Sequence, residues 1–545
     1  MVPTVTILKD GTEMDPSCQL LSMSIQCEVN RIPWAELTLR DGNAAEQKFS
    51  VSDTDFFVPG SNIEIRLGWE GNSKKTVFKG PVVRHSIEAD RRGSYLVVGL
   101  KDAAVKLTGI RRTTVYRDKK DSEAISQIVS DAGLSAGNIT STTTSHKQLV
   151  QYYCTDWDFI LARAEANGLC IYVDAGKMSA AALQVSGAPA KRFEWGISEI
   201  FDFEFRADAS HQYANVNSIA WDAKDLKFTD AATAKSVSLS QGNLKADSIA
   251  SKIGFDTDTL VSLVPLEAGE LTAWADATMA RTRASALRGR LSVSGLNDLK
   301  LLDVVEIAGF GDRFNGNTLV TGIGHRLGEH GWITDVQFGV APESTTTKPG
   351  VTDVPAAGLL PGILGLQIGL VASYSDDPDG EYRVELKLPA VVKGDDTVWA
   401  RLCAPDAGNK RGYFFRPEVG DEVVVGFLND DPRYPVILGA LYGSKNAPPD
   451  DFAKLSDKNI KKGLVTKKGT SISFVDDDKS SVFIQTPEKN KILLDDDAKA
   501  IKLTDQNGNS LTMDQNGVTI KSAKDFKIDA GSGNVEISGS KVDVK

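Results

Sequence analysis

Most enzyme signatures, membrane-spanning segments and disulfide frameworks are missing from this 545-residue sequence. It has no Walker loop, no His-Glu-x-x-His and no Cys-x-x-Cys motif, so we expect no enzymatic activity, no cofactor and no metal. No run of about eighteen uninterrupted apolar residues occurs, which excludes a membrane-crossing helix. The five cysteines, Cys18, Cys27, Cys154, Cys170 and Cys403, are odd in number and far apart, and no signal peptide opens the chain. We therefore expect free thiols and synthesis in a reducing cytoplasm.

A strong positive charge is also absent. The 62 Lys and Arg residues are outnumbered by 73 Asp and Glu residues, which gives a net charge of −11. An acidic chain lacks the attraction that draws basic proteins to nucleic acids or anionic membranes, so we expect no nucleic-acid partner. The short basic clusters at 461–462 and 467–468 are interpreted as solvated surface.

The sequence has instead a repeat in its last seventy or so residues, where an apolar–x–apolar triplet recurs about every seven to ten residues. Turn-forming residues such as 476–478, 507–509 and 516–517 separate the triplets. The triplets are 472–474, 482–484, 492–494, 501–503, 511–513, 518–520, 526–528, 535–537 and 542–544.

Repeats this short predict an elongated β structure that is stacked rung on rung. One rung carries too little apolar surface for a single chain to close on itself, so several copies are expected to wrap around one axis. The flanking residues of each triplet would then face the axis and the middle residue would face water, because side chains alternate along a strand. We also expect backbone groups to be satisfied across chains.

Composition divides the chain into five parts. Residues 1–345 are predicted to form one β-rich region with inserted helices, and 346–361 a Thr/Pro/Gly-rich linker. Closely spaced strands over 362–449 predict a small closed barrel of the oligonucleotide/oligosaccharide-binding (OB) type. Residues 450–468 are a charged connector, and 469–545 are the needle.

Periodicity also predicts individual elements. Capping residues and glycine stops mark helices at 121–129 and 156–166, and an Ala-rich stretch marks a third at 271–287. Alternation predicts strands at 35–39, 63–67, 291–293, 304–307 and 332–336 in the first region, and at 364–371, 382–388, 398–402, 422–428 and 436–441 in the barrel.

Three segments carry a resemblance to a known family. Residues 398–402, 412–427 and 430–442 are similar to the barrel of VgrG-type spike proteins of contractile injection systems. The stretch from Gln151 through Asn167-Gly168 resembles the hub half of the same family. The openings at 30–33 and 78–80 look closest to extracellular systems of the antifeeding-prophage type, with type VI secretion and contractile-phage spikes as relatives.

This resemblance implies a non-enzymatic homotrimer at the tip of an injection machine. The hub would join inner-tube and baseplate proteins, three barrels would form a neck, and the needle would be a trimeric β-helix or β-prism. Sheath contraction would drive it through a target-cell envelope so that cargo effectors can follow. The protein would be assembled in the bacterial cytoplasm and act in an extracellular or cell-anchored phage tail-like particle.

Two sets of residues are assigned to this needle. A PAAR-type tip protein is expected to cap its blunt end, at Val542, Val544 and Lys545. The predicted needle core is Ile492, Leu494, Ile501, Leu503, Val518, Ile520, Phe526, Ile528, Val535 and Ile537.

Several weaker signals are better explained by structure than by chemistry. His325 and His330 are poorly spaced for a metal site. Residues 505–509 resemble half of a calcium loop, but Asn516 stands where its closing Glu belongs, so a plain turn is expected. The acidic triplets 476–478 and 495–497 could bind a cation or could simply be charged turns. The aromatics 413–415 could stack bases or sugars, but core or interface packing is the favoured interpretation.

Two further interpretations would give the protein an enzymatic or carbohydrate-binding function. Some phage relatives carry a lysozyme between barrel and needle, but the connector 450–468 is too short for one, and no effector domain is expected after Lys545. The rival interpretation is a trimeric tailspike-like adhesin or glycan hydrolase. It would need a cleft with paired carboxylates, which the sequence does not place on any rung.

Overall fold

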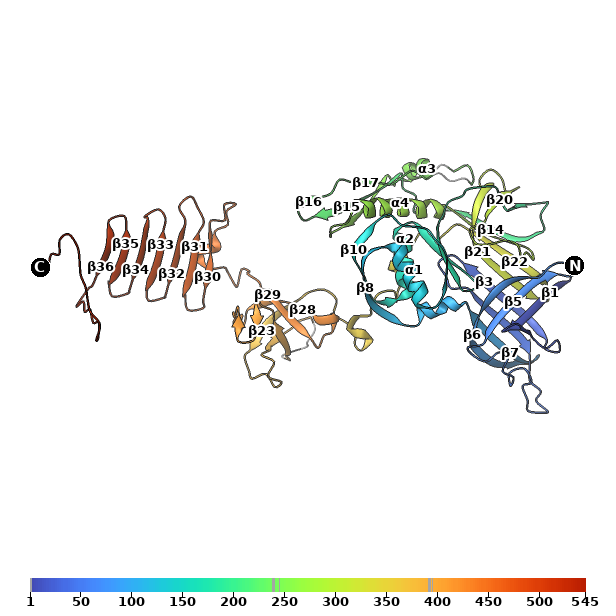
Figure 1. Cartoon of the computed structure of the whole chain (residues 1–545), viewed down its shortest axis with the longest axis horizontal. Coiled ribbons are helices and arrows are strands. Elements are labelled where there is room, and N and C mark those ends of the chain that lie inside the picture. The colour runs from blue at the N-terminus through green and yellow to red at the C-terminus, as the bar shows by residue number, and fades with distance from the viewer. Residues whose placement is uncertain (1, 238–240, 245, 391–393, 395) are drawn as a thin grey trace. The chain divides into compact units, whose positions relative to one another are not determined.

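The computed structural model describes residues 2–237, 241–244, 246–390, 394 and 396–545. It divides the chain into two units, Met1–Asp353 and Val354–Lys545, and the division falls within the predicted linker (Figure 1). The predicted class, mainly β with inserted helices, is confirmed. Among the described residues, no helix is long and apolar enough to cross a membrane.

The strands of the first unit are β1 Pro3–Lys9, β2 Thr12–Glu13, β3 Leu20–Glu28, β4 Trp34–Arg40, β5 Asn62–Trp69, β6 Lys75–Asp90, β7 Gly93–Lys101, β8 Arg111–Lys120, β9 Ser135–Ile139, β10 Ser145–Thr155, β11 Leu169–Asp174, β12 Lys177–Ala182, β13 Lys191–Glu194, β14 Ile200–Ala207, β15 Asn215–Asp222, β16 Lys227–Phe228, β17 Ala232–Thr233, β18 Thr257–Ser262, β19 Leu287–Ser294, β20 Val304–Ala308, β21 Gly316–Gly328 and β22 Gly331–Phe338. Its helices are α1 Asp121–Asp131, α2 Asp156–Ala166, α3 Ala246–Ile253 and α4 Ala268–Ser285, with short 3-10 turns η1 Ala103–Thr108 and η2 Thr345–Thr347.

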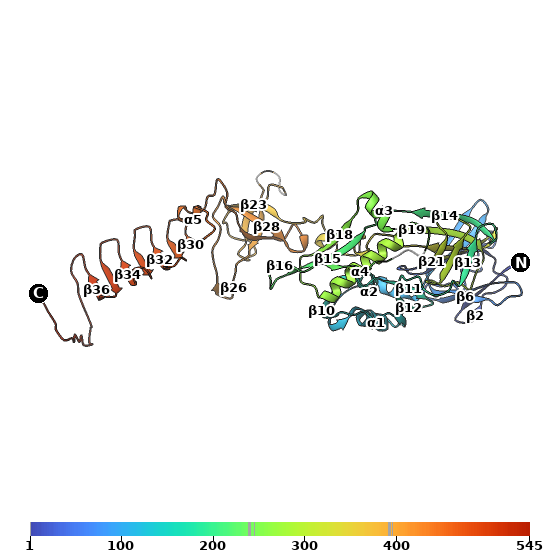
Figure 2. The same ribbon diagram turned by 90° about the horizontal axis from the view of Figure 1, so that it is seen from above.

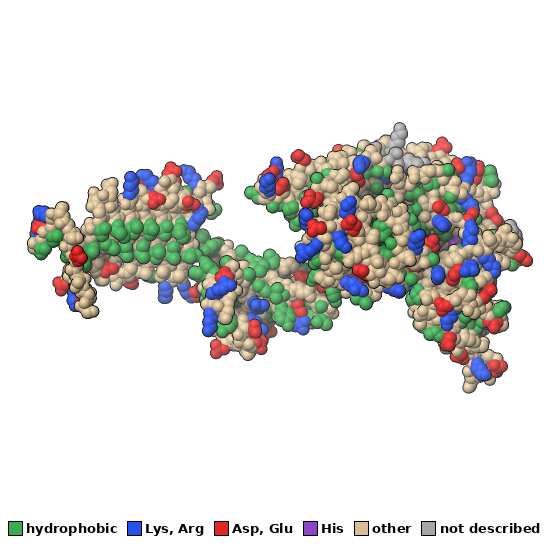
Figure 3. Space-filling model, viewed as in Figure 1, with side chains coloured by type: hydrophobic (Ala, Val, Ile, Leu, Met, Phe, Trp, Pro, Cys, Tyr) green, Lys and Arg blue, Asp and Glu red, His purple; other side chains and the backbone are tan. Residues whose placement is uncertain are grey.

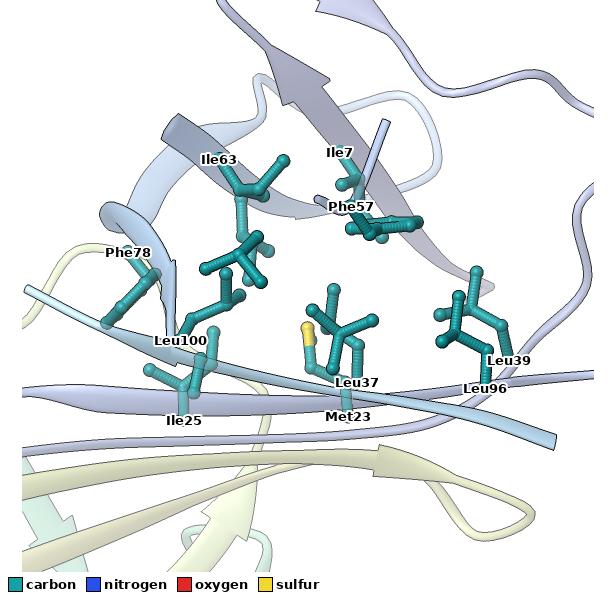
Figure 4. Packing of buried hydrophobic residues seen from close by; sticks show 14 of the residues in the cluster. Ile7, Met23, Ile25, Leu37, Leu39, Phe57, Ile63, Phe78, Leu96 and Leu100 are labelled. Atoms are coloured by element: carbon teal, nitrogen blue, oxygen red, sulfur yellow. The ribbon is translucent and has the colours of Figure 1, made fainter. Parts of the chain in front are cut away.

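A 13-stranded sheet organises this unit, and most of it follows the order β14-β19-β22-β21-β3-β4-β7-β6-β5-β1-β2. Alternating residues of β4 are buried, for example Leu37 and Leu39, so one face of the sheet is apolar. β1, β5 and β6 fold over that face and enclose a first core (Figure 4). A second core lies between β19, β21 and β22 on one side and β13 and β20 on the other.

The predicted helices are confirmed, with small changes at their ends. α2 spans the predicted residues, because the Thr155 hydroxyl accepts the Asp158 N–H at 3.1 Å and caps the first turn. α1 starts at Asp121, where the Glu123 carboxylate accepts the Lys120 N–H at 2.9 Å. α4 ends at Ser285 instead of residue 287, because Leu287 already pairs with β14 as the start of β19.

The second unit contains β23 Gln367–Ser373, β24 Val384–Lys387, β25 Val398–Leu402, β26 Ala407–Gly408, β27 Arg411–Gly412, β28 Glu422–Phe427, β29 Pro435–Ala440, β30 Lys461–Val465, β31 Ser471–Val475, β32 Ser481–Gln485, β33 Lys491–Asp495, β34 Ala500–Thr504, β35 Ser510–Asp514 and β36 Gly517–Lys521, with helix α5 Asp450–Ala453 and 3-10 turns η3 Pro355–Gly358 and η4 Leu428–Asp430. β23, β24, β25, β29 and β28 close into the predicted five-stranded barrel around a small apolar core that includes Val371, Leu386 and Val425.

The C-terminal strands form a seven-stranded sheet in chain order, β30 to β36, in which every strand pairs antiparallel with the next (Figure 2). The expectation that backbone groups are satisfied across chains is therefore wrong for these strands. Turns of a few residues let neighbouring strands pair within one chain, which costs little loop entropy.

The sheet also differs from the predicted needle at both ends. It begins at β30, inside the predicted connector 450–468. The last three triplets, within 522–545, form no strand. They have the apolar pattern but no partner beyond β36 in one chain, and an isolated hairpin without a covered face is marginally stable.

The buried side chain of His325 should make the stability of the first unit depend on pH. Burial lowers the pKa of His325 to about 4, although Asp335 opposes the shift, and the Trp332 indole N–H donates to its Nδ1 at 3.4 Å. The unfolded chain binds this proton below pH 6.5 and the folded chain only near pH 4, so stability should fall as the pH drops through this window. At about 1.4 kcal/mol per pKa unit, the loss is roughly 3 kcal/mol.

Chemical denaturation between pH 7 and pH 4 measures this loss. The His325→Gln variant should lose this component of the pH dependence, whereas His330→Gln, at an exposed position, should retain it. Equal slopes for wild type and His325→Gln would contradict the assignment.

Candidate functional site

The strongest candidate site is one face of the β30–β36 sheet. Each strand has five residues, and its second and fourth side chains point to the same side. The strand register aligns these positions into two columns. The first column is Leu464, Ile472, Ile484, Ile492, Leu503, Leu511 and Ile520, and the second is Phe474, Val482, Leu494, Ile501, Met513 and Val518, preceded by Lys462.

This apolar face is largely uncovered in the single chain. Ile492 and Leu503 are 38% and 39% exposed, and Val518 near the far end of the sheet reaches 68%. The columns appear as a continuous hydrophobic band in Figure 3. A band of this kind, rimmed by charged turns, marks an interaction surface, because monomeric proteins rarely expose large contiguous apolar patches.

The opposite face carries the first, third and fifth residues and is mostly polar. Lys502, Thr512 and Thr519 stand at its middle positions. Phe483 and Leu493 are the apolar middle residues, and they pair with each other while the Lys491 ammonium lies 5.9 Å from the Phe483 ring centre. Val465 and Val475 are apolar fifth residues on the same face. The register thus places flanking and middle residues of the six triplets that lie in strands on opposite faces, as alternation predicts.

Three turns along one edge of the sheet have the same hydrogen-bonding pattern. In 466–470, 486–490 and 505–509, a side-chain oxygen of the first residue accepts the backbone N–H of the fifth, at 3.1, 3.3 and 2.8 Å. The fourth residue is left-handed, with φ of 91°, 66° and 91°, in Gly469, Lys489 and Gly508. Lysine is therefore a strained choice at 489.

Asparagine side chains tie two of these turns to the next part of the edge. The Asn490 Oδ1 accepts the Gln506 N–H at 3.1 Å, and the Asn509 Oδ1 accepts the Ala523 N–H at 2.8 Å. The first bond joins the turn 486–490 to the turn 505–509. The last bond holds the chain just beyond β36 to the ladder, so the edge continues one step past the final strand.

Several acidic residues of the turns bond to the protein itself. The Asp505 carboxylate accepts two backbone and two side-chain N–H groups of Asn507 and Asn509, and these bonds, led by the Asn509 amide, lower the pKa of Asp505. A hydrogen bond from Lys462 at 2.8 Å lowers the pKa of Asp476. Asp505 therefore has the arrangement of a plain turn. No group of three or more potential metal ligands occurs among the described residues.

The predicted core residues fall into two sets. Ile492, Leu494, Ile501, Leu503, Val518 and Ile520 lie together on the apolar face. Phe526, Ile528, Val535, Ile537 and the tip residues Val542, Val544 and Lys545 lie outside any strand and are exposed. Their roles stay predictions.

One member of the face was missed in the sequence. Leu464 belongs to the first column, but its strand β30 shows no apolar triplet because Lys462 occupies the matching position in the second column. The only sequence signal is the pair Leu464-Val465 before a turn at 466–470, which is too short to separate a strand from a connector.

The barrel surface also carries apolar residues. Tyr413, Phe414 and Phe415 are 42%, 71% and 52% exposed, so the core part of their favoured interpretation is wrong, and interface packing stays a prediction. They follow the short hairpin β26–β27, outside the five strands that enclose the core. The Arg416 guanidinium lies 4.8 Å from the Phe414 ring centre and covers part of it.

The two histidines considered for a metal site differ in their surroundings. His325 is buried and bonded within the first core region, whereas His330 is exposed. The chain does contain one Gly-x-Ser-x-Gly stretch, 133–137. A nucleophile elbow joins a strand to a following helix. Here the order is reversed, because the stretch follows α1 and leads into β9.

Family models match three consecutive parts of the chain. The model described as the Alg8 N-terminal domain matches residues 1–329. The type VI secretion system/phage-baseplate injector OB domain matches 367–442, which begins at the first strand of the closed barrel. The phage baseplate V C-terminal trimerisation domain matches 481–545, which begins at β32. The resemblance to VgrG-type spike proteins is confirmed.

Individual relatives align over short stretches only. The type VI secretion system spike protein VgrG5 of Pseudomonas aeruginosa is 30% identical over 107 residues, covering 18% of this chain and 14% of that protein. The actin cross-linking toxin VgrG1 of Vibrio cholerae is 30% identical over 86 residues, covering 15% of this chain and 8% of the toxin. The matches thus span less than a sixth of either relative's length.

Two solved structures are also similar. A tail protein from Neisseria meningitidis has a TM-score of 0.47 at 12% identity, covering 63% of this chain and 98% of its own. The PdpA–VgrG complex in its lidless form has a TM-score of 0.41 at 10% identity, covering 95% of this chain and 98% of the matched chain.

Charged substitutions on the apolar face should prevent self-association of the chain. If copies of the chain cover this face, Leu494→Asp with Ile501→Asp should abolish self-association, because each change would bury an unpaired carboxylate. Analytical ultracentrifugation of the full chain measures the result. Thr512→Asp on the polar face is the matched control and should associate as wild type does. Equal masses for all three proteins would rule out this face as the contact.

The strained turn predicts a stabilising substitution. Lys489→Gly should raise the unfolding midpoint of the C-terminal sheet, since a left-handed residue other than glycine costs roughly 1–2 kcal/mol. Glu488→Gly, at the preceding position without a positive φ, should not raise it. Thermal unfolding followed by circular dichroism compares the two, and a lower midpoint for Lys489→Gly would argue against the strain.

Proposed function

The chain belongs to the Alg8 N-terminal domain family, and we propose that it is the central spike of a contractile injection machine. In this role it joins the inner tube and baseplate to a rigid point that punctures a target-cell envelope on sheath contraction. Cargo effectors then pass along the opened path. The apolar face of β30–β36 is the observation that carries the proposal, because it needs partners that one chain does not supply.

The order of matched domains supports this role. The Alg8 N-terminal model, an injector OB domain and a baseplate trimerisation domain follow one another along the chain without overlap. The first corresponds to the predicted hub, the second to the neck and the third to the needle. A spike needs these parts in this order, since the tube lies at one end and the point at the other.

A homotrimer is the assembly that we propose. Three copies of β30–β36 would form the three sides of a prism, with each apolar face turned inward and each polar face in water. Burying a Leu or Ile side chain fully stabilises by about 1.5–3 kcal/mol, so many half-exposed residues per copy supply ample association energy. The triplets at 526–528, 535–537 and 542–544 would gain partners only in this trimer and extend the point.

The two ends of the spike would meet different proteins. The first unit is the hub that contacts inner-tube and baseplate proteins. At the other end, Val542, Val544 and Lys545 would contact a PAAR-type tip protein that covers the last apolar residues. The particle would be of the phage tail-like kind, assembled in the bacterial cytoplasm and working outside the cell or anchored to it.

The work of this protein would be mechanical instead of enzymatic. Its ladder of backbone hydrogen bonds resists compression, and the turn bonds along its edge hold successive rungs together. The relative named as an actin cross-linking toxin matches this chain over only 8% of its own length, so we do not extend its activity to this chain.

Electron microscopy of the purified full-length chain, combined with a measured mass, tests the proposal. The expected particle is a tapered trimer with a broad hub at one end. A monomer, or a compact particle without a point, would overturn it. Measurable glycan cleavage by the monomer would favour the tailspike interpretation instead.

A truncation separates the contributions of the parts. Removing residues after Val465 should leave a folded hub and barrel and remove the point, since no strand of the barrel depends on β31–β36. Circular dichroism and ultracentrifugation check folding and mass. A truncated protein that is folded but fully monomeric would show that the needle alone holds the copies together.

A further inference from the structure

Lys462 is the single charged residue in the two columns of the apolar face, all of which lie in the described part of the chain. It stands at the start of the second column, whose other members are apolar, and the first column is apolar throughout. β30 is the first strand of the sheet, so the charge marks one end of the face. A charge in an otherwise apolar column is costly wherever that column is covered.

The ammonium group of Lys462 reaches the edge of the sheet. It pairs with the Asp476 carboxylate at 2.8 Å, in the turn that follows β31. Asp476 is held in place, because its N–H donates to the Ile460 carbonyl at 2.7 Å. The Lys462 side chain is 48% exposed in the single chain and that of Asp476 is 70% exposed, so the pair keeps most of its hydration.

The strand that carries Lys462 is a packed part of the sheet. Phe452 of α5 lies against Gly463 on the polar face, so closely that a Cβ at this glycine would come within 2.7 Å of the ring. Lys462 and Leu464 stand on the opposite face, with the two apolar columns. The charge therefore belongs to the first rung of the ladder and would face neighbouring copies together with the rest of the columns.

The other rungs do not determine how copies align along their common axis. Neighbouring rungs are about 4.8 Å apart. At every rung after the first, both columns present Ile, Leu, Val, Phe or Met. Moving one copy by one rung would again bring apolar residues together and would uncover only the end rungs. Because apolar contact is non-directional, it separates these arrangements poorly.

The chain before the sheet would permit a step of this size. Between the last barrel strand β29 and β30, the one described element is the four-residue helix α5. The described residues 441–449 and 454–460 belong to no helix or strand. One residue of extended chain spans about 3.3–3.6 Å, so small changes in these stretches can absorb a displacement of one rung. The axial position of the sheet is therefore left to contacts of the sheet itself.

Lys462 would make a slip costly in either direction. If one copy moves toward its C-terminal end, its Lys462 comes level with the Phe474 rung of its neighbours. If that copy moves the other way, its own Phe474 rung comes level with the neighbours' Lys462. Each displacement removes water from an ammonium group without supplying a new partner, which is unfavourable for any buried ion. Only the aligned arrangement leaves every Lys462 at the open end beside Asp476.

We infer that Lys462 sets the axial register of the needle, so that three copies meet rung for rung. The inference rests on the proposed trimer and adds the residue that aligns its sheets. The match to a baseplate trimerisation domain begins at residue 481, inside the same sheet, and supports further copies of this chain as the occupants of the face. A single polar residue in the apolar seam of a coiled coil likewise specifies register at a cost in stability.

Replacement of Lys462 by leucine in the full-length chain tests the inference. Lys462→Leu completes the apolar column, so the protein should still form trimers, but its copies should no longer align in one way. Cryo-electron microscopy without imposed symmetry counts the needles in which one sheet is displaced along the axis. We expect at least about a tenfold rise in the fraction of displaced needles over wild type, because no buried charge opposes the slip.

Two control variants make the test specific to the charge in the column. Lys461→Leu makes the same change on the polar face and should align as wild type does. Lys462→Arg keeps the charge at the same position and should also align as wild type does. Displacement in either control as frequent as in Lys462→Leu would contradict the assignment.

Analytical ultracentrifugation gives the mass of every variant and separates the two proposals. Trimers of Lys462→Leu that align as wild type does would overturn the role of Lys462 and leave the spike in place. A monomeric wild-type protein would overturn the trimer and the register together.

Discussion

An apolar sheet face that its own chain does not cover is the constraint on which the rest of this structure depends. β30–β36 satisfy their ladder hydrogen bonds within one chain. The second and fourth side chains of each strand nevertheless stay partly exposed in the single chain. The turns between the strands are too short to fold over them. Pairing within one chain therefore satisfies the backbone hydrogen bonds but does not bury the apolar face. A linear, stiff element of this kind becomes stable only by association.

The sequence pattern predicted the residues of this face better than it predicted the first and last strands of the sheet. The spacing of triplets such as 492–494 and 501–503 fixed which side chains share a side, since alternation has a period of two. The same pattern at 526–528 predicted a strand that the single chain does not form, because alternation reports sidedness and not the presence of a partner. β30 was hidden for the opposite reason, as Lys462 interrupts its apolar column.

In the first unit, helix ends could be predicted from neighbouring residues, whereas the pairing of distant strands could not. Helix α2 was predictable to the residue because Thr155, Asn167 and Gly168 mark its ends. The joint between β3 and β21 was not, because it links residues near 25 to residues near 325, and no local signal encodes which strands meet.

The exposed face of β30–β36 limits what the needle can specify by itself. An apolar face is non-directional, and its columns of Ile, Leu and Val tolerate small shifts along the axis. Under the proposed trimer, the needle would therefore contribute association energy and stiffness, and contacts elsewhere in the chain would determine copy number and rotation. A needle of that kind can be repetitive because it does not have to encode the symmetry that it follows.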